Sequence, residues 1–356
     1  MLAPDALPDE DEWVPWVEPA YSRQEVNAAA KLLLRDTQPS VALVDWTRAH
    51  VIVNNWRAAH AYPLNAAAMT LRLSARRVYP SALVSRRIKR LPSILVKLER
   101  FPELSLTRIQ DIGGCRALVR DAGQVRRLTR LYTEGHLAEH IGRVDDYVKT
   151  PREDSGYRSV HLIYRYERKQ PQWEGLKVEL QLRSSRMHAW ATAVEIVDTF
   201  TQQTLKTGGG REEWRRFFKL MSSAIAATER TPPVADTPTA PAALRAELRD
   251  HAQRLNVRAV LTKYRESINI AQTAPKGAYW FVMVLDSEKR EAEAFAYSKG
   301  NLDAAQAFYE EIESAGRPEI NAVLASVDQA KNLRRAYPNY FLDSDRFLRL
   351  LEQAVA

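Results

Sequence analysis

The sequence has a single cysteine, Cys115, among its 356 residues. One thiol can form no disulfide within the chain and cannot supply a zinc site made of several thiolates, which suits a reducing compartment. No run of about 18 consecutive apolar residues occurs, so no membrane-spanning helix is predicted. The N-terminus is acidic and contains proline, without the basic and apolar stretches of an export signal. We therefore expect a cytoplasmic protein with no membrane partner.

A phosphate-binding loop of the Walker type is also missing. Three consecutive glycines, residues 208 to 210, are not followed by the lysine and the serine or threonine of that motif, and they indicate a loop between two helices. The charge balance, 52 Lys+Arg against 44 Asp+Glu, gives a net charge of +8. Such a charge attracts polyanions such as nucleotides or RNA without identifying one.

The order of sequence patterns indicates an α+β protein of two domains. After a loose acidic start over residues 1 to 22, apolar spacing typical of helices continues to about residue 77. Short strand-like runs then alternate with helix and loop signals up to residue 185, and helical spacing returns over 186 to 228. We therefore predict a domain over residues 23 to 230 with a mixed β-sheet flanked by helices. Its predicted strands include Cys115 to Val119, Val160 to Tyr166 and Leu176 to Leu182.

The clearest predicted boundary is a segment rich in proline, threonine and alanine at residues 231 to 242. Such a composition favours an extended linker. Beyond it, residues 243 to 356 show a long helical pattern up to about residue 271, then strand and helix patterns in alternation. This segment is predicted to be a second, smaller α+β domain, either an ordinary folded unit or one that senses a regulator.

Basic side chains outnumber acids on both sides of Pro92. Proline is suited to the first turn of a helix, where its missing N–H costs nothing. Ser93 and Lys97 then lie four residues apart on one helix face, and Arg87 and Lys89 approach from the preceding segment. A helix N-terminus with converging cations can bind an anion, although a basic helix face is more often only solvated.

Asp111 stands just before Gly113 and Gly114, where an apolar strand begins. Two consecutive glycines allow a ligand to approach the backbone closely, and the carboxylate could hold a metal ion. The alternative is that Asp111 caps a turn and the glycines form a bulge.

Tyr157 and His161 lie at another junction between a loop and a strand. A glycine directly before Tyr157 lets the ring be presented for stacking on a base, and His161 offers a hydrogen-bond donor. The alternative is a core aromatic with a structural histidine.

The strand pattern from Val178 to Arg183 alternates strictly between apolar and polar residues. Glu179, Gln181 and Arg183 are therefore predicted on one face of the strand, with the apolar residues in the core. Burying three polar side chains without a partner would leave costly unsatisfied groups. This face is thus a candidate for a functional site, with an ordinary polar face as the alternative.

Taken in order, these clusters resemble the synthetase domain of the RelA/SpoT enzymes. The resemblance covers roughly residues 60 to 228 and rests on five stretches in this order: Arg87 to Lys97, Asp111 to Arg116, Arg152 to His161, Glu179 to Ser184, and Trp190 with Ala191. Each stretch alone is a weak signal, and the ordered set is specific.

The resemblance implies a nucleotidyltransferase-like fold and a pyrophosphokinase with Mg²⁺ as cofactor. Such an enzyme transfers the β,γ-pyrophosphate of ATP to the 3′-hydroxyl of GDP or GTP. Asp111 and Glu179 would be the catalytic and metal-binding carboxylates, Glu179 either as a metal ligand or as a general base. The implied ATP-binding residues are Arg87, Lys89, Ser93, Lys97 and Arg116. The implied acceptor-binding residues are Arg152, Tyr157, His161, Gln181 and Arg183.

Several departures from the family pattern concern the acceptor pocket. One additional residue separates Asp146 from Gly156, Gly113 stands where alanine is common, and Glu195 comes one position later than in compact members. A toxin-like enzyme acting on the tRNA 3′ end or on adenosine nucleotides, and an inactive nucleotide or RNA sensor, therefore stay as alternatives. The chain has no His-Asp dipeptide, so hydrolysis of the product is not expected. A homo-oligomer and a regulator bound by residues 243 to 356 stay open.

Overall fold

The computed structural model of the chain places most of the predicted elements. It describes residues 16–34, 43–135, 137–167, 170–201, 205, 209–266, 278–286, 288–289, 291–298, 300–315, 317, 319–327, 333–337 and 344–356. Gly208 and the predicted helical residues 267–271 lie outside this part of the chain. Among the helices that the structure describes, none has the length and apolar character needed to cross a membrane.

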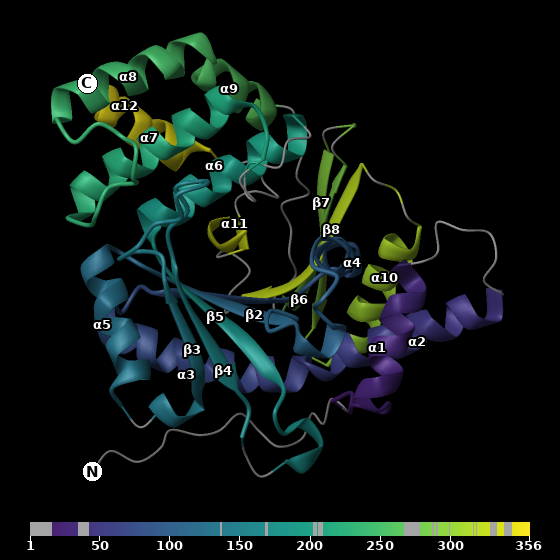
Figure 1. The fold of residues 1–356 in the computed structure, drawn as a ribbon. Helices are drawn as coiled ribbons and strands as arrows, with labels where there is room; N and C mark the ends of the chain where they lie inside the picture. Colours follow the sequence, from purple (N-terminus) through teal and green to yellow (C-terminus); the bar gives the residue numbers. More distant parts are fainter. Residues whose placement is uncertain are drawn as a thin grey trace.

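A twisted sheet of eight strands runs through the molecule (Figure 1). Its strand order is β3-β4-β5-β2-β1-β8-β6-β7. Strands β2 and β5 pair in parallel and the other neighbours are antiparallel, so the predicted α+β class with a mixed sheet is confirmed. The strands are β1 (Leu83–Ile88), β2 (Gly113–Val119), β3 (Ile141–Asp146), β4 (Val160–Arg165), β5 (Lys177–Ser184), β6 (Ala278–Asp286), β7 (Glu291–Ser298) and β8 (Ile320–Val327).

Helices from the N-terminal third cover one face of the strands β1, β2 and β5. Apolar residues of this layer, among them Val53, Leu71 and Ile94, form one buried core with Val178, Leu180 and Leu182 of β5. Pro92 occupies the first turn of its helix, as predicted. The helices are α1 (Arg23–Leu34), α2 (Leu43–Ala59), α3 (Ala61–Val78), α4 (Leu91–Arg100) and α5 (Ala122–Thr133).

A second group of helices lies on the opposite side of the sheet (Figure 1). Its core contains Phe217, Phe218 and Phe347 in mutual ring contact. The single long helix predicted after residue 241 is broken at Asn256, whose φ of 47° no helix tolerates. The helices of this group are α6 (Ser185–Thr201), α7 (Glu212–Glu229), α8 (Pro241–Arg254), α9 (Val257–Glu266) and α12 (Asp345–Val355).

The described strands of the C-terminal segment, β6, β7 and β8, belong to the same sheet as β1 to β5. Strand β8 pairs with β1, with Ser85 opposite Val327 and Arg87 opposite Ala325. Helix α10 (Leu302–Ser314) packs on β6 and β8, while the short α11 (Leu333–Ala336) lies beside β1 and β8. Pairing between strands this distant in sequence leaves no trace in local periodicity, because each strand satisfies the same alternating pattern whichever neighbour it has.

The segment predicted as an extended linker has no helix or strand between residues 231 and 240, but it is packed against α7. Val234 is buried, and its backbone N–H donates a hydrogen bond of 2.9 Å to the Ser223 hydroxyl. The hydroxyl groups of Ser223 and Thr237 lie 2.8 Å apart. The boundary at residues 231–242 therefore does not separate two freely tethered units.

Candidate nucleotide and metal site

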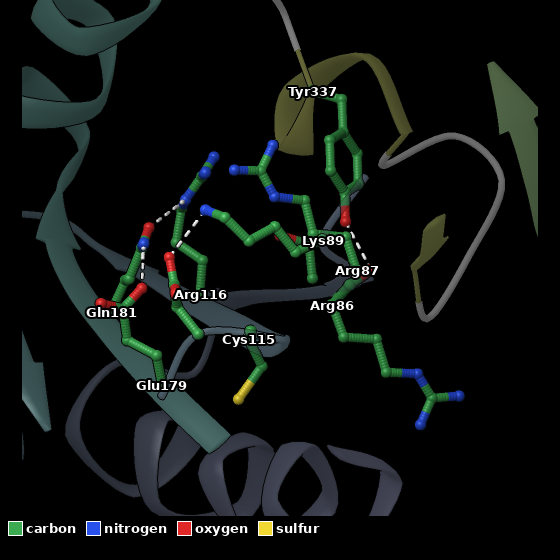
Figure 2. Close-up of a pocket in the computed structure, with 11 residues that line it drawn as sticks. Arg86, Arg87, Lys89, Cys115, Arg116, Glu179, Gln181 and Tyr337 are labelled. Atoms are coloured by element: carbon green, nitrogen blue, oxygen red, sulfur yellow. Dashed lines mark hydrogen bonds and ion pairs between the residues drawn. The ribbon is translucent and has the colours of Figure 1, made fainter. Parts of the chain in front are cut away.

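The polar residues of β5, β2 and β1 meet on one face of the sheet (Figure 2). In the register of these strands, Gly114 lies beside Glu179 and opposite Arg87, and Arg116 lies beside Gln181. The apolar residues that alternate with Glu179 and Gln181 point into the core on the other face. The register of the three strands thus places the polar residues of β5 beside those of β2 and β1, and together they form one polar surface.

Gly114 leaves a gap in the middle of this surface. A Cβ atom there would come no closer than 3.9 Å to any neighbour, the Glu179 carbonyl oxygen. The missing side chain opens a cavity of about 40 Å³ between Arg87 and Glu179. A larger cavity of about 240 Å³ adjoins it, shares Arg87 and Lys89 with it, and extends to Ser93 of α4.

Asp111 is held between two lysines at the edge of the cavity. Its Oδ2 lies 2.7 Å from Lys89 Nζ and its Oδ1 lies 2.9 Å from Lys97 Nζ. Burial opposes ionisation, but the two ammonium groups outweigh it and hold the pKa of Asp111 well below its usual range. Burial acts on the other partner too and lowers the pKa of Lys89. The Asp111 carboxylate is therefore ionised at neutral pH.

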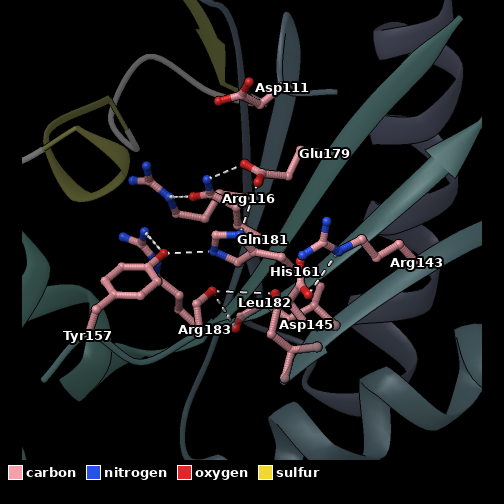
Figure 3. A network of polar contacts seen from close by, with 12 residues as sticks. Asp111, Arg116, Arg143, Asp145, Tyr157, His161, Glu179, Gln181, Leu182 and Arg183 are labelled. Atoms are coloured by element: carbon pink, nitrogen blue, oxygen red, sulfur yellow. Dashed lines mark hydrogen bonds and ion pairs between the residues drawn. The ribbon is translucent and has the colours of Figure 1, made fainter. Parts of the chain in front are cut away.

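Glu179 lies deeper in the site and is bonded on both oxygens (Figure 3). His161 Nδ1 lies 3.0 Å from Oε1, and Gln181 Nε2 donates to Oε2 at 2.6 Å. Burial works against the charge, yet these two contacts lower the pKa of Glu179 to about 2. For His161 burial also disfavours the charged ring, but Tyr157 and Glu179 prevail and raise its pKa to about 9. The two residues form a buried ion pair.

Tyr157 connects this pair to Arg183 (Figure 3). The Tyr157 hydroxyl lies 2.8 Å from His161 Nε2 and accepts a hydrogen bond from Arg183 at 2.6 Å. The Arg183 guanidinium also lies over the tyrosine ring, 5.1 Å from its centroid. Burial alone would raise the tyrosine pKa, but the two cationic neighbours lower it below the usual range.

Arg116 belongs to a crowded group of cations. Its Nε donates to Gln181 Oε1 at 3.3 Å, and burial followed by repulsion from Arg183 and Arg87 lowers its pKa to about 10. Cations held this close together without a matching number of acids gain from a bound anion. The site therefore combines two ionised carboxylates with a surplus of positive charge.

The structure brings together most of the residues predicted for the site. Arg152 is the exception, because its side chain is 43% exposed and pairs with Asp154 at 2.8 Å. It lines neither cavity. The predicted residues that line the two cavities are Arg87, Lys89, Ser93, Asp111, Arg116, Glu179 and Gln181. Lys97 and His161 contact these residues directly, and Tyr157 and Arg183 are joined to them through His161.

Sequence reasoning missed Tyr337, which lines the smaller cavity from the C-terminal segment (Figure 2). Its hydroxyl donates a hydrogen bond of 2.6 Å to the backbone carbonyl of Arg86. The preceding residue, Ala336, offers its carbonyl oxygen to Arg116 at 3.5 Å. No motif marks this segment in the sequence, since its place depends on the pairing of β8 with β1.

The two carboxylates fit a magnesium ion. Among the described residues, no group of three or more His, Cys, Asp or Glu side chains is arranged to hold a metal. Mg²⁺ does not need such a group, because it usually binds through one or two carboxylates, water and the phosphates of a substrate. Asp111 and Glu179 supply such hard oxygen ligands, both ionised, beside cations that would receive phosphate oxygens.

A known protein family matches the part of the chain that contains the end of β1 and the whole of β2 and β5. Residues 86–197 match the model of a family described as "Region found in RelA / SpoT proteins". Uncharacterized proteins of Mycobacterium tuberculosis and Mycobacterium bovis are 33% identical over 121 residues, which are 32% of this chain and 39% of theirs. The chain thus spans about two fifths of the length of the curated relatives it matches.

Solved structures with a similar arrangement include small alarmone synthetase 2 of Bacillus subtilis. It is 22% identical with a TM-score of 0.40, covering 49% of this chain and 92% of that one. Small alarmone synthetase 1 of the same organism, bound to its product pppGpp, is 24% identical with a TM-score of 0.35, covering 41% and 74%.

Fold and site define an α+β protein whose mixed sheet carries two ionised carboxylates among cations on one face. Within that class, residues 86–197 match the region found in RelA/SpoT proteins, in agreement with the resemblance that the motif order indicates.

Proposed function

We propose that the chain is a magnesium-dependent pyrophosphokinase that transfers the β,γ-pyrophosphate of ATP to the 3′-hydroxyl of a guanosine nucleotide. The observation that carries the proposal is the pairing of Asp111 and Glu179 with a ring of cations inside the region matched to the RelA/SpoT family. In the proposed reaction the 3′-oxygen attacks the β-phosphorus and its proton passes to water, while the bond from that phosphorus to the α,β-bridging oxygen breaks and AMP leaves.

The cations support the donor half of the proposal. Lys89 and Lys97 now neutralise Asp111, and Ser93 lies one turn before Lys97 on α4. Triphosphate oxygens are suited to the same ammonium groups, because a phosphate carries more charge than the carboxylate it would displace. A magnesium ion at Asp111 would supply charge neutralisation to the phosphates. Positioning and charge neutralisation provide most of the acceleration in phosphoryl transfer.

The contacts of Glu179 favour one of its two implied roles. A general base works best when its pKa is near the working pH, whereas the pKa of Glu179 is lowered to about 2. A carboxylate that remains ionised in a buried site is better suited to hold a cation or to orient a neighbouring group. We therefore assign Glu179 to metal binding and to the orientation of His161, with which it forms an ion pair.

The acceptor half rests on the cluster of Tyr157, His161 and Arg183. These side chains are joined to Glu179 by direct contacts, so an acceptor bound against them would bring its hydroxyl toward the carboxylates. Arg152 is left out of this assignment because it pairs with Asp154 away from the cavities. The choice of a guanosine nucleotide as acceptor follows the family resemblance.

Transfer of labelled phosphate tests the proposal directly. The chain is incubated with γ-labelled ATP and Mg²⁺, and with GDP, GTP, ATP or deacylated tRNA in separate reactions. We expect label in a product of GDP or GTP together with stoichiometric AMP. Label in tRNA or in an adenosine product would replace the acceptor, and no transfer to any acceptor by folded protein would remove the enzymatic assignment.

A matched pair of variants then tests the carboxylate. Glu179→Gln should lower turnover by at least about a hundredfold, the scale of one preorganised charged group in a transition state, while ATP binding changes little. Glu153→Gln is the control, because this glutamate is exposed and lies in the loop beside Arg152. Near-normal turnover in Glu179→Gln would show that the catalytic carboxylate has been misplaced.

A further inference from the structure

A third cavity, of about 310 Å³, lies on the same side of the sheet as the nucleotide site but shares no lining residue with it. Leu118 of β2 forms part of its wall, and Ser185 and Asp345, the first residues of α6 and α12, lie at its edge. Its volume is in the range of small-molecule binding sites, about 300–1,000 Å³. The first turns of two helices therefore border one ligand-sized space.

The charge of the lining is strongly positive. Among the described residues, one carboxylate, Asp345, lines the cavity together with four guanidinium groups. Burial, followed by repulsion from other arginines, lowers the pKa of Arg346. Like charges gathered in this way destabilise one another unless an anion lies between them. The four arginines are Arg120, Arg335, Arg346 and Arg349.

His188 adds a second and independent observation at the buried wall of the cavity. It is 7% exposed, and burial holds its pKa well below the usual range, so the ring is neutral. Its Nε2 lies 3.3 Å from the Arg335 carbonyl oxygen and donates to it. Its Nδ1 is buried with no hydrogen-bond partner among the described residues. Such an orphaned acceptor needs a hydrogen-bond donor, which a hydroxyl or N–H group of a nucleotide can supply and a deprotonated phosphate oxygen cannot.

We propose that this cavity is a second binding site for an oligophosphate group, either of a nucleotide or of a free polyphosphate. Guanidinium groups bind phosphate oxygens in pairs of parallel hydrogen bonds. Asp345 reduces the positive charge by one, and Arg120 is held by Asp121 at 3.0 Å. This leaves Arg335, Arg346 and Arg349 as the principal phosphate ligands.

The position of Arg335 links this site to the nucleotide site along the backbone. The Arg335 side chain lines the third cavity, while Ala336 contacts Arg116 and Tyr337 lines the smaller cavity of the nucleotide site. Arg335, which would bind the anion, therefore directly precedes Ala336, whose carbonyl oxygen contacts Arg116. The proposal concerns binding at the third cavity and does not depend on the reaction proposed above.

Calorimetric titration of the full chain with tripolyphosphate, and separately with GTP, tests the proposal. The variant Lys89→Gln/Lys97→Gln is used as the background, because it removes two of the cations that attract phosphate to the nucleotide site. We expect binding of one equivalent to persist in this background. The tighter of the two ligands identifies whether a free polyphosphate or a nucleotide is the natural source of the phosphates.

Charge reversal in the same background locates the bound anion. Arg346→Glu/Arg349→Glu should weaken binding by more than about tenfold, since two guanidinium ligands of the phosphate are replaced by groups of like charge. Arg127→Glu/Arg130→Glu is the matched control, with the same charge change and spacing on the exposed face of α5. The neutral pair Arg346→Gln/Arg349→Gln gives the same answer if the reversal disturbs folding. No binding in the background, or equal loss in the control, overturns the proposal.

Discussion

The ion pair between Arg57 and Glu313 carries the sharpest prediction on stability, because it joins α2 to helix α10, which belongs to the C-terminal segment. Arg57 Nη2 lies 2.9 Å from Glu313 Oε2, and the two side chains are 4% and 8% exposed. Glu313 also accepts from the Tyr309 hydroxyl at 2.5 Å and from the Leu91 backbone N–H, at the start of α4, at 3.4 Å. The perturbation is Glu313→Gln, which keeps the shape and removes the charge.

The expected loss of stability comes from the Arg57 charge, which Glu313→Gln leaves without its partner. Removing one partner of a buried pair leaves an uncompensated charge, and such changes cost about 3–5 kcal/mol. Glu310 also attracts Arg57, and the guanidinium keeps its hydrogen bonds to Asn54 and to the Lys89 carbonyl. These remaining contacts place the expected loss near the lower end, about 3 kcal/mol.

Urea unfolding measures this loss as a change in the midpoint at constant slope. The double variant Arg57→Met/Glu313→Gln has no stranded charge. Its free energy of unfolding should therefore be about 1–3 kcal/mol higher than the value obtained by adding the losses of the two single variants. The control is Asp250→Asn, which breaks an ion pair with Arg254 whose side chains are each 58% exposed. That change should cost less than about 1 kcal/mol. A loss in Glu313→Gln no larger than in this control would refute the reasoning.

Two further predictions concern the site itself. Because the folded pKa of His161 is raised to about 9 from 6.5, its ion pair stabilises the protein fully below pH 6.5, and this stabilisation is lost as the pH rises through 9. Wild type should therefore lose about 2–3 kcal/mol more between pH 6 and 9.5 than His161→Gln does, measured by urea unfolding, and equal losses would contradict the assignment. Gly114→Val should fill the gap between Arg87 and Glu179 and abolish nucleotide binding without unfolding the chain. Gly142→Val, on the exposed strand β3 where a Cβ is also free to about 4.0 Å, should leave binding intact, and equal effects would mean that the gap is not the site.

The sequence by itself determined the parts that depend on local periodicity. Alternation from Val178 to Arg183 separates a core face from a polar face, and a proline at position 92 begins the helix that carries Ser93 and Lys97. These features depend on the period of a strand or a helix, which neighbouring residues set through backbone geometry. The order of the motifs in the sequence also indicates the resemblance to RelA/SpoT proteins, without any knowledge of which strands are neighbours.

The tertiary structure decided which distant segments complete the site. Strand β8 pairs with β1, and the short helix α11 that comes after it in the sequence lies beside both strands. Arg335 of α11 lines the third cavity, and Tyr337 lines the nucleotide cavity. The tertiary structure also places Arg152 outside the two cavities, where its side chain pairs with Asp154. Register and strand order follow from the packing of whole faces, so an alternating pattern that is correct for each strand cannot say which strands become neighbours.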